Sequence, residues 1–433
     1  MFQLLTESPA SELHPVHRQV PEGRRLAETI LQQQPFRWFY LRLLTFLQRS
    51  VVVCVMECVE EKFKGLSLAR RSRPDEATYL LHVALQPSDL LAVSCSNFTI
   101  QLHNKHTLAR VGERRGHTGR MCGVTFAHSS PDLLYSGSAD GTVRGWDVRR
   151  PGTEAVQMFK SDPSHLYCSF DLSCSDLLLC AGTEKVGEDS YLVFWDARKP
   201  GSGLLGSYSE SHSDDITHVR FHPRDKDRLA SGSTDGLVNV FDLSQGAEEE
   251  ALVATCNGVS STGSLCWSGA SYTQLLCLSL DEGLHLWDLS QLDTEKPLAV
   301  FSTGDARSLT LLEDGGGVDY LVGGAWLEET QTLLVLGGKD SGELHLMECD
   351  TGGLRLLRSL KGGHASTVRC FLWDAAEEAL VTGGEDAQLL LWKPGGVELA
   401  AGKRESMKSQ SDFRLKSRAH KKYSYQKEKK TKS

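Results

Sequence analysis

The segment Leu133–Asp147, LLYSGSADGTVRGWD, decides the fold of this chain. It consists of an apolar run, a turn of small residues and a second alternating run that ends in a Trp-Asp pair. The dipeptide Asp140-Gly141 indicates a hairpin, because a tight turn between two strands needs a positive φ, which Asp-Gly tolerates. The segment therefore predicts two antiparallel strands.

The same pattern recurs along the chain. Seven units close on one residue each, and these residues stand 43 to 60 positions apart: His103, Trp146, Trp195, Phe241, Trp287, Met347 and Trp392. Five units also carry an aspartate six positions before the closing residue: Asp140, Asp189, Asp235, Asp281 and Asp386. A period of roughly 40–45 residues is typical of a four-stranded propeller blade. We therefore predict an all-β, seven-bladed propeller.

These units resemble WD40 repeats. In that family a buried network links the His of a Gly-His pair, a Ser or Thr in the second strand, the turn Asp and the Trp of the third strand. The resemblance implies such a network in three units: His117, Ser136, Asp140 and Trp146; His212, Ser231 and Asp235, with Phe241 in place of Trp; His364, Thr382, Asp386 and Trp392. Although a His, an Asp and a Ser also make up a hydrolase triad, an enzyme has no need of three copies. We interpret these residues as structural.

The resemblance to one particular member of the family covers residues from about Met56 to Ser406 and does not reach residues 1–55. We therefore predict an N-terminal extension at 1–55, a WD40 β-propeller at 56–400 and a disordered Lys-rich tail at 401–433. We expect the extension to be disordered or to stem from an alternative start. Its apolar stretch is interrupted by three arginines, which argues against a membrane-spanning helix, and no membrane partner is expected.

Ring closure follows from the phase of the repeat. Each unit begins in the outer strand of the preceding blade, so the last blade lacks its outermost strand after Trp392. The segment 62–71, KFKGLSLARR, is the expected donor of that strand, because pairing first with last removes the open edge.

Charge divides the chain into two parts. Its 433 residues carry a net charge of −9, but the segment from Lys403 to Ser433 alone carries 12 Lys or Arg and 3 acidic residues. An acidic body is not a nucleic-acid-binding surface, so only the tail is a candidate for weak RNA contact. The tail is also a candidate nuclear or nucleolar targeting segment; the alternative is a solubilising tail. The 12 scattered cysteines are typical of reduced thiols in an intracellular protein, in the nucleus or, alternatively, the cytoplasm.

Catalytic signatures are missing from the sequence, which has no phosphate-binding loop, no nucleophile elbow and no zinc-binding helix. We expect no cofactor and no metal. An enzyme on this fold would need a polar, unrepeated cluster in the central channel, and none is evident in the sequence. We therefore expect a non-enzymatic, monomeric scaffold that binds other proteins.

Two arginines are candidate docking residues. The form Trp-Asp-x-Arg occurs twice and places Arg149 and Arg198 just after a third strand. It resembles the docking box of substrate receptors for cullin-4 RING ubiquitin ligases, in which the Arg contacts the ligase adaptor. This resemblance gives an alternative function, a substrate receptor. The competing interpretation is an ordinary solvated arginine.

Overall fold

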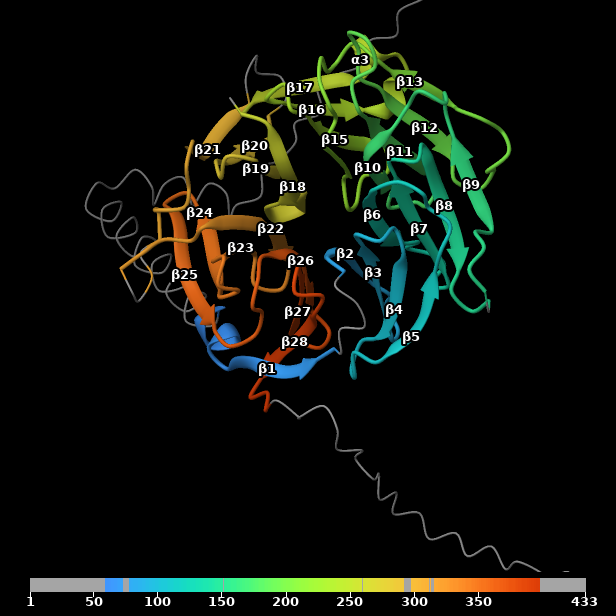
Figure 1. Cartoon of the computed structure of the whole chain (residues 1–433). Helices are drawn as coiled ribbons and strands as arrows, with labels where there is room; N and C mark the ends of the chain where they lie inside the picture. Colours follow the sequence, from blue (N-terminus) through green and yellow to red (C-terminus); the bar gives the residue numbers. More distant parts are fainter. Residues whose placement is uncertain are drawn as a thin grey trace, which may run out of the picture. The chain divides into compact units, whose positions relative to one another are not determined.

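The computed structural model describes residues 59–72, 78–150, 152–258, 260–291, 297–310, 312 and 315–397. The predicted extension at 1–55 and the predicted tail at 401–433 lie outside these residues. The described strands form seven antiparallel sheets of four strands each, arranged as blades around a central channel (Figure 1). The chain folds as the seven-bladed β-propeller that the repeats predict.

Each blade contains four strands, which run from the channel outward in chain order except in the last blade. Blade 1 contains β2 (Leu80–Leu85), β3 (Leu90–Cys95), β4 (Ile100–Asn104) and β5 (Arg110–Arg114); blade 2 contains β6 (Met121–Phe126), β7 (Leu133–Ser138), β8 (Thr142–Asp147) and β9 (Gln157–Lys160); blade 3 contains β10 (Tyr167–Leu172), β11 (Leu178–Thr183), β12 (Leu192–Asp196) and β13 (Gly206–Tyr208); blade 4 contains β14 (His218–Phe221), β15 (Arg228–Gly232), β16 (Leu237–Asp242) and β17 (Leu252–Asn257); blade 5 contains β18 (Thr262–Ser268), β19 (Gln274–Ser279), β20 (Leu284–Asp288) and β21 (Leu298–Thr303); blade 6 contains β22 (Tyr320–Leu327), β23 (Thr332–Gly338), β24 (Leu344–Asp350) and β25 (Gly353–Leu360); blade 7 contains β26 (Val368–Asp374), β27 (Ala379–Gly384), β28 (Leu389–Pro394) and β1 (Leu66–Arg71). Short helical segments are η1 (Leu243–Gln245), α3 (Glu248–Ala251) and η2 (Ala270–Tyr272).

The hairpin at Asp140-Gly141 forms as its sequence predicts. Gly141 has a φ of +72°, and a Cβ at this position would lie 2.8 Å from the carbonyl oxygen of His165. Asp140 Oδ1 accepts hydrogen bonds from Thr142 N at 3.1 Å and Thr142 Oγ1 at 2.6 Å, which fixes the start of β8. The turn therefore needs both residues: glycine for its backbone and aspartate for its side chain.

The core lies between neighbouring blades, because each sheet is covered on both faces. All seven residues of β23 are buried, and five of the six residues of β7 are buried. Strands that are covered on both sides become nearly continuous apolar runs, which explains stretches such as TLLVL in β23.

The ring is closed by the N-terminal end of the described chain. β1 pairs with β28 in antiparallel fashion, from Leu66 opposite Pro394 to Arg71 opposite Leu390. Residues 62–64 of the segment expected as a strand are helical instead, within a helical turn at 59–64. Phe63 in this turn is fully buried, and its ring centroid lies 5.1 Å from that of Trp373.

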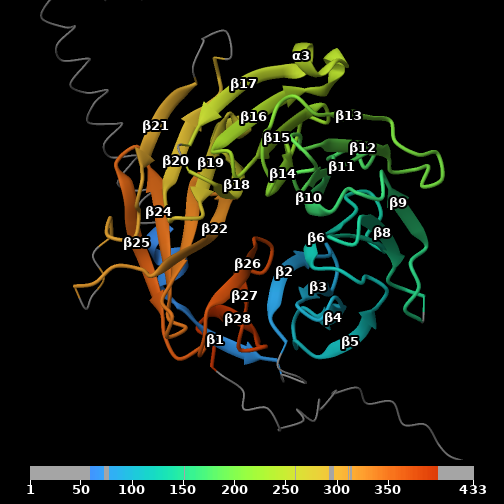
Figure 2. The same ribbon diagram turned by 45° about the horizontal axis from the view of Figure 1, so that its top comes forward.

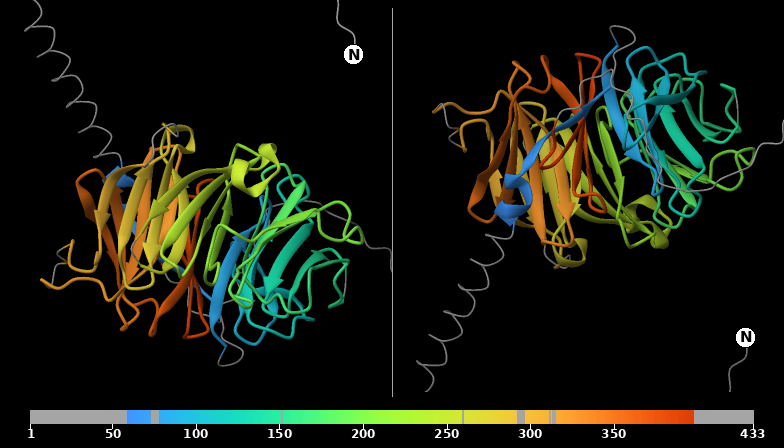
Figure 3. Two further views of the ribbon diagram at one scale, coloured as in Figure 1. Left: turned by 90° about the horizontal axis from the view of Figure 1, so that it is seen from above. Right: turned by 90° about the horizontal axis from the view of Figure 1, so that it is seen from below.

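The loops of the propeller fall on two opposite faces, because successive strands are antiparallel (Figures 2 and 3). We call the upper rim the face with the connections between blades and the loops that join second to third strands. The lower rim carries the loops that join first to second and third to fourth strands. Asp140 thus lies at the upper rim and Arg149 at the lower rim.

Candidate functional site

The second blade contains a continuous hydrogen-bonded network. His117 Nδ1 lies 2.9 Å from Asp140 Oδ2, and His117 Nε2 lies 2.8 Å from Ser136 Oγ. The indole nitrogen of Trp146 donates to the same Ser136 Oγ at 2.8 Å. Thr118 N also donates to Asp140 Oδ2 at 3.1 Å. The network ties the loop that enters the blade to its second and third strands.

Blade 7 repeats this arrangement. His364 Nδ1 lies 3.0 Å from Asp386 Oδ1, and its Nε2 lies 2.8 Å from Thr382 Oγ1. Trp392 donates its indole N–H to Thr382 Oγ1 at 3.0 Å. Threonine thus takes the place of serine without loss of any contact.

Blade 4 contains the network without its indole. His212 Nδ1 lies 3.0 Å from Asp235 Oδ2, and its Nε2 lies 2.7 Å from Ser231 Oγ. Phe241 is fully buried in the position of the tryptophan and has no N–H to donate. Instead, Asn239 Nδ2 lies 3.4 Å from His212 Nε2.

The three aspartates are held as carboxylates. Burial alone would raise the pKa of Asp140, but hydrogen bonds from His117 and Thr142 outweigh it and keep this pKa well below its usual range. The same balance of burial and a histidine partner lowers the pKa of Asp235 and Asp386. Each carboxylate is therefore an acceptor that the neighbouring imidazole satisfies.

The three polar trios, each a His, an Asp and a Ser or Thr of one network, are unsuited to nucleophilic catalysis. Ser136, Ser231 and Thr382 are all 0% exposed, so no substrate can reach their hydroxyl groups. In blades 2 and 7 the hydroxyl oxygen also receives an indole N–H, which a nucleophile would have to give up. The arrangement stiffens a blade, because every buried polar group in it has a partner.

Asp189 does not occupy the turn position that its spacing suggested. In blade 3 the second strand ends at Thr183 and the third begins at Leu192, so the connecting loop is longer than in blade 2. Asp189 pairs through its backbone with Val186 in this loop. The indole of Trp195 donates to the carbonyl oxygen of Lys160 at 3.1 Å instead of to a hydroxyl group.

Arg149 and Arg198 both fold back onto the aspartate of their own motif. Arg149 Nε lies 3.0 Å from Asp147 Oδ1, and its NH2 lies 3.0 Å from Oδ2. Arg198 makes the same two contacts with Asp196 at 2.8 Å each. Their side chains remain 67% and 62% exposed at equivalent places in adjacent blades. These ion pairs lower the pKa of both aspartates to about 2.

A third Asp-x-Arg pair occurs outside the Trp-Asp motif. In the loop after β21, Arg307 Nε lies 2.9 Å from Asp305 Oδ1, and its NH2 lies 2.7 Å from Oδ2. This two-bond pairing, which we call the Asp-x-Arg clasp, therefore forms at all three Asp-x-Arg sequences among the described residues. Its presence after β8 and β12 does not by itself require a docking partner.

The central channel carries the polar, unrepeated cluster that the sequence did not reveal. His82 on β2, His218 and Arg220 on β14, and Arg369 on β26 all line one cavity of about 440 Å³. No motif in the sequence indicated this cluster. The cluster is made up of residues from separate inner strands, so no contiguous sequence motif could predict it. The cavity thiol of Cys266 is no nucleophile, since burial raises its pKa to about 11.

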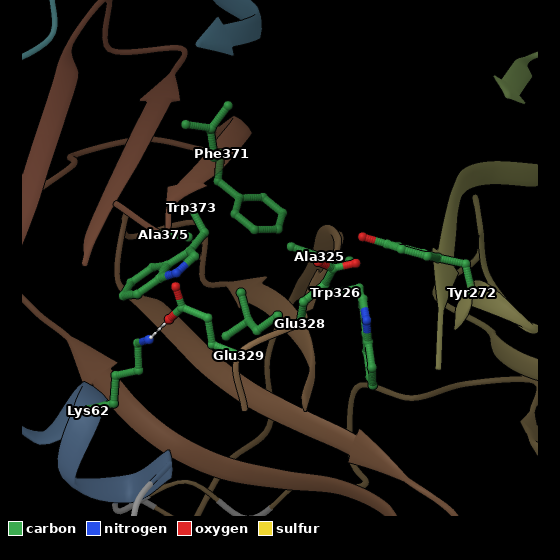
Figure 4. Close-up of a pocket in the computed structure, with 12 residues that line it drawn as sticks. Lys62, Tyr272, Ala325, Trp326, Glu328, Glu329, Phe371, Trp373 and Ala375 are labelled. Carbon is green, nitrogen blue, oxygen red and sulfur yellow. Dashed lines mark hydrogen bonds and ion pairs between the residues drawn. The ribbon is translucent and has the colours of Figure 1, made fainter. Parts of the chain in front are cut away.

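A second cavity of about 450 Å³ opens at the lower rim and shares lining residues with the channel (Figure 4). Lys62 binds Glu329 at 2.9 Å, and its ammonium group lies 5.7 Å from the ring centroid of Trp373. Trp326 and Tyr272 line both cavities, which makes the lower end of the channel aromatic.

Metal ligands do not gather in the described part of the chain, where no group of three or more His, Cys, Asp or Glu residues could hold an ion. Within the same residues, no helix has the length and apolar character needed to cross a membrane.

Comparison with known proteins supports the repeat assignment. The family described as WD domain, G-beta repeat, matches residues 109–147, 204–242 and 354–393. Each match begins near the outer strand of one blade and ends at the third strand of the next, and the three matches cover the three networks described above.

Several proteins are similar over most of the chain. The family member whose resemblance is visible in the sequence is WD repeat-containing protein 89, and its homolog from Dictyostelium discoideum is 27% identical over 73% of this chain and 83% of its own length. WD repeat-containing protein GTS1 of Arabidopsis thaliana is 28% identical over 70% of this chain and 78% of its own length. An uncharacterized WD repeat-containing protein of Schizosaccharomyces pombe is 25% identical over 75% of this chain and 97% of its own length.

Proposed function

Because this chain is a β-propeller of WD40 repeats, a fold that generally mediates contacts between proteins, we propose that it is a non-enzymatic, monomeric scaffold for other proteins. The observation that carries the proposal is the burial of the three polar trios. Their hydroxyl groups are 0% exposed, so these His, Asp and Ser or Thr side chains stabilise the blades and are not accessible to a substrate. A rigid ring with exposed loops on two rims is suited to holding partners in fixed positions.

A reconstitution experiment tests the scaffold proposal. Proteins captured from nuclear extract by residues 56–433 would be purified and mixed with the purified propeller, and complexes would be measured by size-exclusion chromatography with light scattering. We expect at least one partner to form a complex of defined stoichiometry with a single propeller. A self-associating propeller, or captured proteins that never bind when purified, would contradict the proposal.

A substrate-receptor role is the second candidate. It is favoured by the positions of Arg149 and Arg198, which are exposed at the same place in adjacent blades of the lower rim. A carboxylate of the ligase adaptor would have to compete with Asp147 and Asp196 for these guanidinium groups. Exposed ion pairs of this kind are weak, so an adaptor carboxylate could replace Asp147 or Asp196 at little cost in free energy.

The matched control for this role is Arg307, which makes the same clasp outside the motif. We expect the adaptor to co-purify with wild type and with Arg307→Ala, but not with the double variant Arg149→Ala/Arg198→Ala. All three proteins should melt at the same temperature, because the pairs are exposed. Equal recovery of the adaptor with the double variant would remove the receptor role.

We also propose that the Lys-rich tail directs the protein to the nucleus and contributes weak contact with RNA. The tail lies outside the described residues, so its sequence alone supports the proposal. A fluorescent fusion truncated after Gly402 should lose nuclear enrichment, whereas truncation of residues 1–55 should not. Phosphate contacts through lysines would weaken steeply with added salt. Unchanged nuclear signal after removal of the tail would refute the targeting role.

A further inference from the structure

The described wall of the central channel contains two arginines and no carboxylate, although the chain as a whole is acidic. The cavity is lined by inner strands of five blades, β2, β14, β18, β22 and β26. Arg220 and Arg369 contribute two guanidinium groups and His82 and His218 two imidazoles, while none of the described lining residues is Asp or Glu. This distribution points to an anionic ligand.

Arg220 is the cation available to such a ligand. Its side chain is exposed on the channel wall, and no hydrogen bond or ion pair of its guanidinium group occurs among the described residues. Burial raises the pKa of nearby Asp171, and the charge of Arg220 partly offsets this rise. The carboxylate of Asp171 nevertheless accepts its hydrogen bonds from the backbone N–H groups of Phe221 at 2.8 Å and Leu172 at 2.9 Å. Arg369, by contrast, is paired with Glu385 at 2.7 Å.

Two imidazoles, those of His82 and His218, line the same cavity. His218 Nδ1 is shielded from bulk solvent and has no hydrogen-bond partner among the described residues. His82 Nδ1 lies 2.8 Å from Ser94 Oγ, which leaves its Nε2 for the cavity. Burial, helped by the charge of Arg220, lowers the pKa of His82 to about 4 and that of His218 well below its usual value. Both rings are therefore neutral near pH 7, and each carries one N–H.

We propose that the central channel is a binding site for an organic oxyanion, a phosphate or carboxylate group that Arg220 holds through its guanidinium fork and that His218 and His82 cap with ring N–H groups. A planar guanidinium group matches the geometry of both oxyanions and can donate two parallel hydrogen bonds to them. If the ring of His218 turns toward the ligand, its buried nitrogen would also gain a hydrogen-bond partner.

The lower end of the channel would bind the apolar part of the ligand. Phe371, Trp326 and Tyr272 line both the channel and the lower-rim cavity, and Figure 4 shows their rings there. An aromatic or aliphatic body attached to the oxyanion would pack against these rings, with the charged group pointing toward Arg220. The inference concerns a small ligand inside the ring and is independent of the scaffold proposal.

The test uses the full chain and three probes: inorganic phosphate, phenyl phosphate and benzoate. Binding would be followed by calorimetry and by NMR of the imidazole nitrogens of His82 and His218. We expect saturable one-to-one binding, tighter for phenyl phosphate than for inorganic phosphate, with shifts of both imidazoles. Comparison of phenyl phosphate with benzoate distinguishes a phosphate site from a carboxylate site.

Substitutions locate the site. Arg220→Gln should weaken binding at least about tenfold, Arg220→Lys should weaken it less because the charge remains, and the exposed control Arg307→Gln should leave it unchanged. If Arg220→Gln fails to fold, His218→Gln provides the second variant, with an expected loss of several-fold. The proposal is overturned if no probe binds up to about 10 mM, a range that includes very weak affinities. It is equally overturned if binding is insensitive to these variants.

Discussion

Trp146 donates its indole N–H to Ser136 Oγ over 2.8 Å, and this bond joins the third strand of blade 2 to the His117–Asp140 pair. Since Ser136 Oγ also lies 2.8 Å from His117 Nε2, one hydroxyl group serves two partners. In blade 4 the corresponding Ser231 serves only His212, because Phe241 replaces the indole. The two blades therefore offer a natural comparison of the network with and without its indole bond.

Ser136→Ala should destabilise the protein more than Ser231→Ala. The first substitution leaves an indole N–H and an imidazole nitrogen without partners in a buried site. The second affects only the imidazole of His212, which keeps its 3.4 Å contact with Asn239. Each unsatisfied buried group costs about 1–3 kcal/mol, so we expect losses of about 2–6 and about 1–3 kcal/mol, respectively. Urea unfolding followed by tryptophan fluorescence would measure both. Equal losses would show that the indole bond contributes nothing.

The pattern in the sequence predicted those parts of the fold that depend on local chemistry. The turn at Asp140-Gly141 follows from backbone preference, and the need for a closing strand follows from the phase of the repeat. Asp189 shows the limit of spacing. It stands six positions before Trp195 as Asp140 does before Trp146, but the loop of blade 3 is longer and places Asp189 elsewhere.

The channel cluster could not be predicted in this way. His82 and Arg220 are far apart in the sequence. They line the same cavity only because the ring brings the inner strands of blades 1 and 4 to the central channel. The sole hint is that His82 and Arg220 interrupt apolar inner strands. The same is true of the Asp-x-Arg clasp, since only the structure shows that Arg149 turns back to Asp147.

Acid should weaken the protein partly through Asp140. Its folded-state pKa is depressed, so the stabilisation is complete above the unfolded-state pKa of about 4 and is lost as the pH falls from there toward the lower, folded-state value. Asp140→Asn should lower the melting temperature at pH 7, and its difference from wild type should shrink below about pH 4. As a control, Asp189→Asn, at an exposed loop residue, should leave the melting temperature at pH 7 unchanged. A difference that stays constant down to pH 2 would mean that the carboxylate charge is irrelevant.

Closure of the ring should depend on the apolar residues of the N-terminal segment. Leu66 at the start of β1 is 1% exposed and packs in the same cluster as Leu390 and Trp392 of blade 7. Leu66→Ala should reduce the free energy of unfolding by about 2–5 kcal/mol, the range for buried leucine. The matched substitution Leu298→Ala, at a residue that is 69% exposed, should cost far less. Equal melting temperatures for the two variants would refute a stabilising role for the closing strand.

Thiol labelling should distinguish exposed from buried cysteines. The ten cysteines among the described residues are all free, and Cys180 and Cys277 lie in the core. Burial raises the pKa of Cys277 to about 12 and that of Cys180 well above its usual value, so neither offers a thiolate near neutral pH. Cys174 is only partly buried, and its pKa is raised less. In a background with Cys54→Ser and Cys58→Ser, maleimide at pH 8 should label Cys174 first, as mass spectrometry of peptides would show. Labelling of Cys180 at the same rate would mean that blades 3 and 4 separate readily, since only opening of the ring exposes that thiol.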